Sequence, residues 1–240
     1  MPVIPKVIHY CWFGGGNEPE AVKKCIKSWE KMCPEYTIKR WDESNFDISV
    51  NSYTAEAYNK KRWSFVSDLA RLKIIYENGG IYLDTDVELL RTLDSVLDNK
   101  FFFALEKDSN PETNLIDLHV ATGLGFGAEK GNNVLKSLID EYNGLHFVND
   151  CVEDLTPCPI RNTRALKKYG LVLENVMQKF QGGTIYPSEY FCPIECSTGR
   201  ENFSNNTISV HHYAASWKSK SEKLVYGLRL LKRRIVGIFK

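Results

Sequence analysis

The sequence of 240 residues predicts an α/β fold with a mostly parallel central sheet. A β-branched apolar run over residues 3–13 is typical of a buried strand, and the alternating segment 36–41 is typical of a second one. An amphipathic helical pattern lies between the two. The order strand, helix, strand indicates a β-α-β unit, and such units build parallel sheets.

These first elements have clear boundaries. The triplet Gly14-Gly15-Gly16 should end the first strand in a loop. The helix should begin at Pro19 and end before Pro34, because proline suits the first turn of a helix and cannot continue one. Apolar side chains recur at spacings of three and four residues, which predicts one buried face. They are Val22, Ile26, Trp29 and Cys33.

A second helix is predicted over residues 64–78, with Ser64 as its N-cap and Gly79-Gly80 as its stop. Its apolar residues cover most of the circumference, so this helix should be largely buried. The polar residues Ser67, Asp68 and Arg71 interrupt the apolar surface on one side, and a polar cluster on a buried helix is a candidate functional feature.

Further along the chain the pattern predicts strands and one more clear helix, separated by loops. The expected elements are a strand at 81–83, a strand at 101–105, a loop over 107–118, a helix over 131–142 and strands at 184–186 and 207–213. No internal repeat or linker is visible. We therefore expect one domain over residues 1–217, followed by an appendage over residues 218–240.

Charge supports this division. The net charge is only +1, with 43% hydrophobic and 25% charged residues, an ordinary globular composition that excludes collagen and acidic disordered chains. Residues 218–240 hold eight basic residues and one acidic residue, so the segment carries +7 and the rest about −6. The acidic body argues against a nucleic-acid partner.

The appendage resembles a membrane-binding helix. Leu224, Leu228, Leu231 and Ile235 recur at helical spacing among basic residues, which favours attachment to an anionic membrane surface through residues 218–240. The alternative is a packed or solvated terminal helix. The seven cysteines are odd in number and irregularly spaced, and the N-terminus lacks a signal pattern. We therefore expect a cytoplasmic protein, peripheral on the inner face of the cell membrane.

Asp84 and Asp86 are the strongest candidate for a metal site. They stand two residues apart at the end of the predicted strand 81–83, so on a strand both carboxylates would face the same side. Ligands of open α/β sheets bind at that edge. Two neighbouring carboxylates repel unless a cation joins them, and Mn²⁺ or Mg²⁺ is the natural one. The alternative is an ordinary polar turn.

Three segments carry a more specific signal. Residues 62–71 (RWSFVSDLAR) and 76–86 (YENGGIYLDTD) resemble the DXD sugar-transfer region of glycosyltransferase family 32, which includes yeast mannosyltransferase-like proteins, bacterial capsular polysaccharide glycosyltransferases and large clostridial glucosylating toxins. Residues 4–14 (IPKVIHYCWFG) resemble that family's first strand, and 211–217 (HHYAASW) resemble its closing element. The matches follow the family's order.

The resemblance implies roles around the donor. Trp12 would stack on the nucleotide base, and Asp68 and Arg71 would contact the ribose and the sugar. Tyr82 would line the donor site, and Asp84 would reach the ribose and the metal. Structural alternatives stay open: a strand-end aromatic for Trp12, an ion pair one helical turn apart for Asp68 and Arg71, and a core position for Tyr82.

The resemblance also implies how the metal and diphosphate are held. Asp86 would bind the metal directly, and His211 would complete its ligands, although the toxins offer a carboxylate at that place. Ser216 and Trp217 would close over the diphosphate. Adjacent residues of a strand face opposite sides, so only one of His211 and His212 can point into the site, and either could be a structural histidine.

By the same resemblance, the fold would be GT-A and the chain would be a glycosyltransferase that retains anomeric configuration, with Asp84, Asp86 and Arg71 as its catalytic residues. A UDP-sugar donor is favoured over a GDP-sugar, with a saccharide acceptor, possibly lipid-linked, in bacterial surface polysaccharide synthesis. Alternatives are a metal-dependent nucleotidyltransferase or phosphohydrolase, and a non-catalytic membrane-binding module. The Gly123–Gly127 segment lacks the spacing of a dinucleotide motif and could be a wall of the donor site or an ordinary turn.

Overall fold

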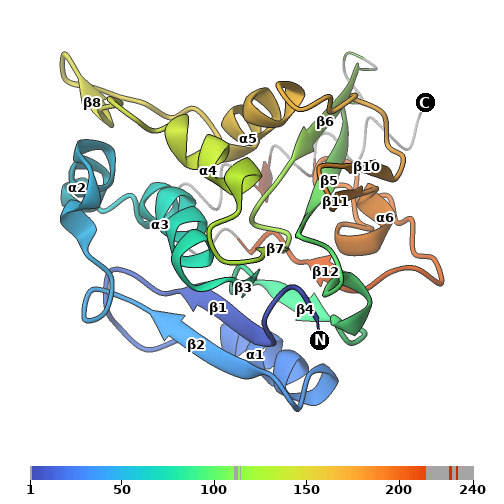
Figure 1. Ribbon diagram of the computed structural model, residues 1–240. Coiled ribbons are helices and arrows are strands. Elements are labelled where there is room, and N and C mark those ends of the chain that lie inside the picture. Colours follow the sequence, from blue (N-terminus) through green and yellow to red (C-terminus); the bar gives the residue numbers. More distant parts are fainter. Residues whose placement is uncertain (1, 111–112, 114, 215–226, 229–230, 232–240) are drawn as a thin grey trace.

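A computed structural model describes residues 2–110, 113, 115–214, 227–228 and 231. It confirms the predicted α/β class, with five strands of the central sheet running in one direction (Figure 1). The predicted division at residue 217 lies outside the described residues, as does the predicted helix over 218–240 apart from residues 227–228 and 231. No helix in the described part of the chain is long and apolar enough to cross a bilayer.

The central sheet has eight strands in the order β10-β11-β5-β7-β3-β1-β2, with β6 paired to β5. Strands β1, β2, β3, β5 and β11 share one direction, and β6, β7 and β10 run against them. Their bounds are β1 Val7–Cys11, β2 Thr37–Trp41, β3 Gly80–Tyr82, β5 Phe101–Asn110, β6 Leu115–Val120, β7 Phe126–Ala128, β10 Gln178–Phe180 and β11 Gly183–Tyr186.

Two small antiparallel pairs lie outside this sheet. One joins β4 (Val87–Leu89) to β12 (Ser209–His211), and the other joins β8 (Val148–Asn149) to β9 (Val152–Glu153). The helices are α1 Glu20–Met32, α2 Ser52–Asn59, α3 Trp63–Asn78, α4 Asn133–Asp140, α5 Cys158–Lys167 and α6 Ser188–Phe191, with single 3₁₀ turns at Ile48–Val50 and Asp94–Val96.

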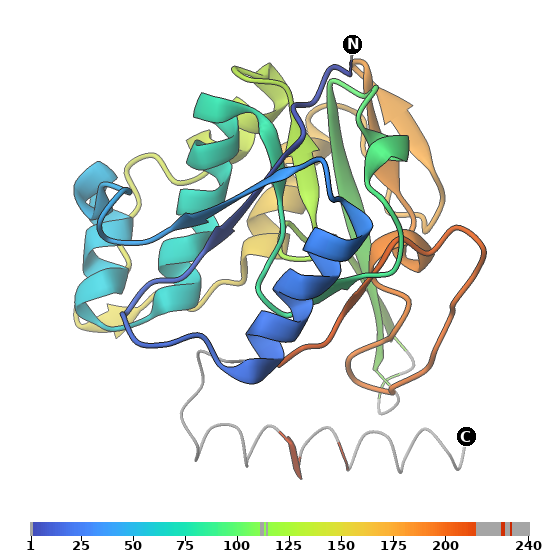
Figure 2. The same cartoon turned by 90° about the horizontal axis from the view of Figure 1, so that it is seen from below.

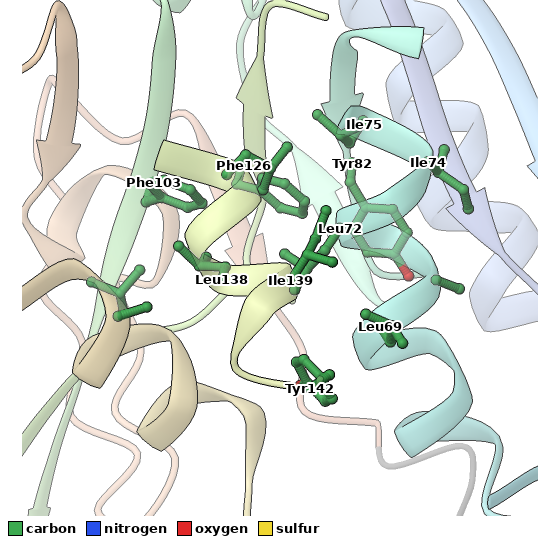
Figure 3. Close-up of a cluster of buried hydrophobic side chains, with 14 of the residues drawn as sticks. Leu69, Leu72, Ile74, Ile75, Tyr82, Phe103, Phe126, Leu138, Ile139 and Tyr142 are labelled. Carbon is green, nitrogen blue, oxygen red and sulfur yellow. The ribbon is translucent and has the colours of Figure 1, made fainter. Parts of the chain in front are cut away.

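The sheet separates two hydrophobic cores because successive strand residues point to opposite faces. On β5, Phe101 and Phe103 face one core with α3, α4 and α5, whereas Phe102 and Ala104 face the other with α1 and α6. Figures 1 and 2 show α3 and α1 on opposite sides of β1. Figure 3 shows the larger core, where Phe103 and Phe126 lie near α4 and Tyr82 lies against α3.

Several predicted boundaries need correction. Ser64 lies inside α3 and does not cap it, because Arg62 holds the cap position and makes no side-chain capping bond. The predicted loop over 107–118 is wrong: β5 continues to Asn110 and pairs with β6 in a long hairpin. Helix α2 was not predicted, because its mixed polar and aromatic sequence has no clear periodicity.

The larger core gives a first testable prediction. Phe103 is fully buried and stacks on Phe126, with ring centroids 5.6 Å apart and planes inclined by 11°. Phe103→Ala should therefore lower the free energy of unfolding by about 3–5 kcal/mol, measured by urea denaturation. The exposed Leu115→Ala should change it by less than about 0.5 kcal/mol. Equal effects of the two substitutions would contradict this description of the core.

Candidate active site

Asp84 and Asp86 lie in the turn that joins β3 to β4. Strand β3 ends at Tyr82, and the Val87 N–H donates to the Asp84 carbonyl at 3.0 Å, which closes the turn. The two carboxylates therefore do not lie on a strand, and the expectation that strand alternation would align them is wrong. The turn still brings them together, because one oxygen of each lies within 4.8 Å of the other and of a His211 nitrogen.

Pairing of β12 with β4 brings His211 to this turn. His211 stands opposite Val87 in the ladder, and the next backbone N–H, that of His212, donates to the Asp86 carbonyl at 3.0 Å. The His211 Nε2 atom lies 3.2 Å from Asp86 Oδ1. His212 points away and pairs with Glu88 at 2.8 Å. Of the two adjacent histidines, His211 is the one that faces the carboxylates.

Burial and mutual attraction shift the pKa of both members of the Asp86–His211 pair. Burial alone would raise the pKa of Asp86, but His211 and the Ala214 N–H, which donates to Asp86 at 2.9 Å, hold it at about 2. Burial alone would lower the pKa of His211, but Asp86 and then Asp84 raise it to about 9. At neutral pH the metal-free pair is therefore an imidazolium and a carboxylate.

The chemistry of these side chains fits a divalent cation. Two carboxylates and an imidazole together offer oxygen and nitrogen ligands, a combination that Mn²⁺ binds in proteins. Mg²⁺ prefers oxygen ligands, so the two carboxylates alone would suit it. Asp84 and Asp86 would otherwise repel each other, and a cation would remove that cost. In the described part of the chain this is the one cluster of metal-binding side chains.

Helix α3 contributes the polar pair that the sequence singled out. Arg71 and Asp68 stand one turn apart, and an Arg71 NH2 donates to Asp68 at 2.5 Å. The other Arg71 nitrogen lies 3.4 Å from Asp84, so the pair is more than an ion pair within one helix. Arg71 is only 4% exposed, and a buried cation needs such partners.

Tyr82 supports Asp84 from inside the fold. Its hydroxyl donates to Asp84 Oδ1 at 2.9 Å, and the Arg71 guanidinium lies 5.2 Å from the centre of its ring. The ring is almost completely buried, as the core alternative expected, so only the hydroxyl reaches the site. Burial raises the pKa of Asp84, whereas Arg71 lowers it and Asp86 raises it. Burial prevails and the pKa lies above its usual value, although Arg71, His211 and the Tyr82 hydroxyl all favour the ionised form of Asp84.

Gly123 gives the Gly123–Gly127 segment a place in the site. A Cβ atom at this position would lie 2.4 Å from Asp84 Oδ2 and 3.2 Å from an Arg71 nitrogen. The Gly123 carbonyl accepts from the Asp84 N–H at 3.2 Å. The glycine is therefore needed for space beside a carboxylate, while residues 126–128 continue as β7.

The remaining predicted donor residues lie at the edges of the site or outside the described residues. Trp12 follows the carboxyl end of β1, which runs parallel to β3, so it stands at the same sheet edge as Asp84. It is half-buried, and its Nε1 donates to the Gly16 carbonyl at 3.3 Å. Ser216 and Trp217 lie outside the described residues.

The structure also brings residues to the site that the sequence did not assign. Tyr213 packs the edge of its ring against His211, with centroids 4.3 Å apart, and Glu106 adds negative charge near both. Thr122 and Cys158 lie beside Gly123 and Asp68, respectively. In the sequence, Thr122 is marked only by the neighbouring glycine and Cys158 only by its place at a helix start. Neither residue can be assigned to the site without the fold.

Comparison with known proteins agrees with this geometry. Residues 19–103 match the family described as glycosyltransferase sugar-binding region containing DXD motif. An inositol phosphoceramide mannosyltransferase of Schizosaccharomyces pombe is 38% identical over 103 residues, which cover 39% of this chain and 27% of that protein. An uncharacterized glycosyltransferase of Acanthamoeba polyphaga mimivirus is 30% identical over 121 residues, 48% of each chain.

Among solved structures, PaToxG glycosyltransferase aligns with a TM-score of 0.48 and 18% identity over 69% of each chain. The chain spans about a quarter to a half of the curated relatives it matches. The matched region holds Asp68, Arg71 and the DXD aspartates Asp84 and Asp86. Residues 19–103 therefore carry a glycosyltransferase sugar-binding region with a DXD motif, and the resemblance to that region predicted from the sequence is confirmed.

The Asp86–His211 pair predicts a pH dependence of metal binding. His211 holds a proton up to about pH 9, and a metal ligand must release it, so Mn²⁺ affinity should rise about tenfold per pH unit between about pH 6 and 9. Calorimetry in buffers of different ionisation enthalpy should show about one proton released per metal at about pH 7.

Two variants separate the adjacent histidines. His211→Gln should weaken Mn²⁺ binding and remove this pH dependence, whereas His212→Gln should leave both unchanged, because His212 faces Glu88. An affinity that does not vary with pH in the unaltered protein, or a dependence that disappears with His212→Gln, would contradict the assignment of His211.

Proposed function

We propose that this chain transfers a sugar from a nucleotide-sugar donor to a saccharide acceptor, in a reaction that needs a divalent cation, Mn²⁺ or Mg²⁺. The observation that carries the proposal is the Asp84–Asp86–His211 cluster at the end of β3, with Arg71 beside it. Its two aspartates and Arg71 belong to the matched sugar-binding region, which favours transfer of a sugar over phosphate hydrolysis.

Asp84, Asp86 and His211 would hold the cation, which would supply positive charge against the charge that develops on the diphosphate leaving group. Arg71 would act in the same direction from a fixed position, because Asp68 and Asp84 hold its guanidinium on two sides. A charge fixed in advance needs no reorganisation during the reaction.

Around the nucleotide, Trp12 would stack on the base, and Ser216 with Trp217 would close over the diphosphate. We favour a UDP-sugar over a GDP-sugar, a GT-A arrangement and retention of anomeric configuration. In the front-face route that retention suggests, the leaving phosphate oxygen takes the proton of the attacking acceptor hydroxyl. Asp84 and Asp68 are engaged by Arg71, so neither is free to act as a displacement nucleophile.

Slow hydrolysis of the donor tests this function without knowledge of the acceptor. A panel of UDP- and GDP-sugars with Mn²⁺ or Mg²⁺ should contain at least one UDP-sugar that the protein hydrolyses. Asp86→Asn should lower that rate on the order of 100-fold, because a ligand of the cation is weakened. The exposed Asp98→Asn is the matched control. Full activity of Asp86→Asn in Mn²⁺ would refute the assignment.

The sequence of residues 218–240 supports a proposal about location: a peripheral cytoplasmic protein on the inner face of the cell membrane, with a lipid-linked acceptor in bacterial surface polysaccharide synthesis. Truncation after residue 217 should abolish co-sedimentation with vesicles that contain anionic lipid, because the +7 segment supplies the attraction. The full chain should bind purely zwitterionic vesicles weakly. Unchanged recovery of the truncated chain on anionic vesicles would reject this location.

A further inference from the structure

Several buried polar atoms near α3 have no hydrogen-bond partner in the described part of the chain. Buried polar atoms in native proteins are usually paired, so such atoms indicate a water or a ligand that completes them. Apart from His119 Nδ1 and His211 Nδ1, they are Tyr53 Oη, Thr54 Oγ1, Tyr142 Oη, Arg161 Nε and Asn162 Oδ1. These five come from α2, from α5 and from the turn after α4; α2 and α4 pack against α3, and α5 packs against α4 and β6.

Asn162 is the member of this group with a direct polar connection to the candidate active site. Its Nδ2 donates to Thr122 Oγ1 at 3.2 Å, and Thr122 precedes Gly123, which lies against Asp84. Asn162 is 1% exposed, and its Oδ1 has no partner among the described residues. Exchange of the amide oxygen and nitrogen would still leave one of the two atoms without a partner.

A second connection runs through Cys158 at the start of α5. Its Sγ lies 4.0 Å from Thr122 Oγ1, and its thiol is a hydrogen-bond partner of Asp68. Cys158 and Asp84 are partly exposed, whereas Asn162 and Thr122 are buried. Thr122 and Cys158 therefore link the buried amide of Asn162 to Asp68 and to the glycine that lies against Asp84.

We propose that Asn162, positioned by Thr122, binds one hydroxyl of the transferred sugar and so selects the donor. The inference rests on the proposed function and names the part of the site that distinguishes one hexose from another. A hexose hydroxyl can both donate and accept a hydrogen bond, so it could pair with the one polar atom of the Asn162 amide that has no partner among the described residues. A buried polar atom discriminates strongly, because a sugar with the hydroxyl in another orientation leaves it unpaired.

Epimeric donors test the inference. For the preferred UDP-hexose and its epimer, the ratio of kcat/KM for donor hydrolysis should fall on the order of 10- to 100-fold in Asn162→Ala. Binding of UDP with Mn²⁺, measured by calorimetry, should stay within about twofold, because the proposed contact of the amide is with the sugar, which UDP lacks. The exposed Asn149→Ala is the matched control and should change neither quantity.

Thr122 provides a second set of variants in case Asn162→Ala does not fold. Thr122→Val removes the hydroxyl that holds the amide and should reduce the epimer ratio, whereas Thr122→Ser keeps the hydroxyl and should restore it. An unchanged ratio in folded Asn162→Ala or Thr122→Val, or equal losses for both epimers, would mean that the amide is a structural group completed by water, and would overturn the inference.

The unaltered protein separates this failure from failure of the proposed function. If it hydrolyses a UDP-hexose and the variants keep its epimer ratio, only the role of Asn162 is refuted. If it binds no UDP and hydrolyses no donor of the panel, the proposed function is refuted. The role of Asn162 in selecting a donor is then refuted as well.

Discussion

The candidate site depends on the short pairing of β4 with β12. This ladder joins the turn that holds Asp84 and Asp86 to His211, which comes from near the end of the described chain. Helix α1 holds the other side of β4, because Trp29 Nε1 donates to the Val87 carbonyl at 2.7 Å and the Ser28 hydroxyl accepts from the Leu89 N–H at 2.9 Å. With β4 fixed on both sides, the three side chains that could hold a metal ion converge without a disulfide or a long strand.

A second constraint is the pairing of buried charge. Burying an ion is costly unless an opposite charge and hydrogen bonds accompany it. Arg71 meets this condition through Asp68 and Asp84, and the Tyr82 hydroxyl donates a hydrogen bond to Asp84. The arrangement leaves no room for a side chain at position 123, where glycine lets the backbone approach the Asp84 carboxylate. The same contacts that satisfy the buried charges therefore fix the positions of the groups proposed to act on the donor.

The sequence predicted the class of the fold and much of the site, but not the geometry that joins them. Residues close in the chain, such as Asp68 with Arg71 and Asp84 with Asp86, were identifiable because helical spacing and turn position act locally. The local sequence does not determine which of two adjacent histidines faces the two aspartates, since that depends on a ladder between distant segments. The polar roles of Thr122 and Asn162 were invisible for the same reason, as only tertiary contacts bring a buried amide to a sugar-binding region.

The position of β12 in the chain also bears on how the protein is made. Contacts between segments far apart in sequence form late, because the long loop between them must close first. During synthesis, a chain that has already folded β1, α3 and β3 would carry Asp84 and Asp86 without their imidazole partner. Such an intermediate holds two neighbouring carboxylates with little compensation beyond Arg71. A divalent cation bound by Asp84, Asp86 and His211 would therefore also stabilise the pairing of β12 with β4, because it would bind only the folded arrangement.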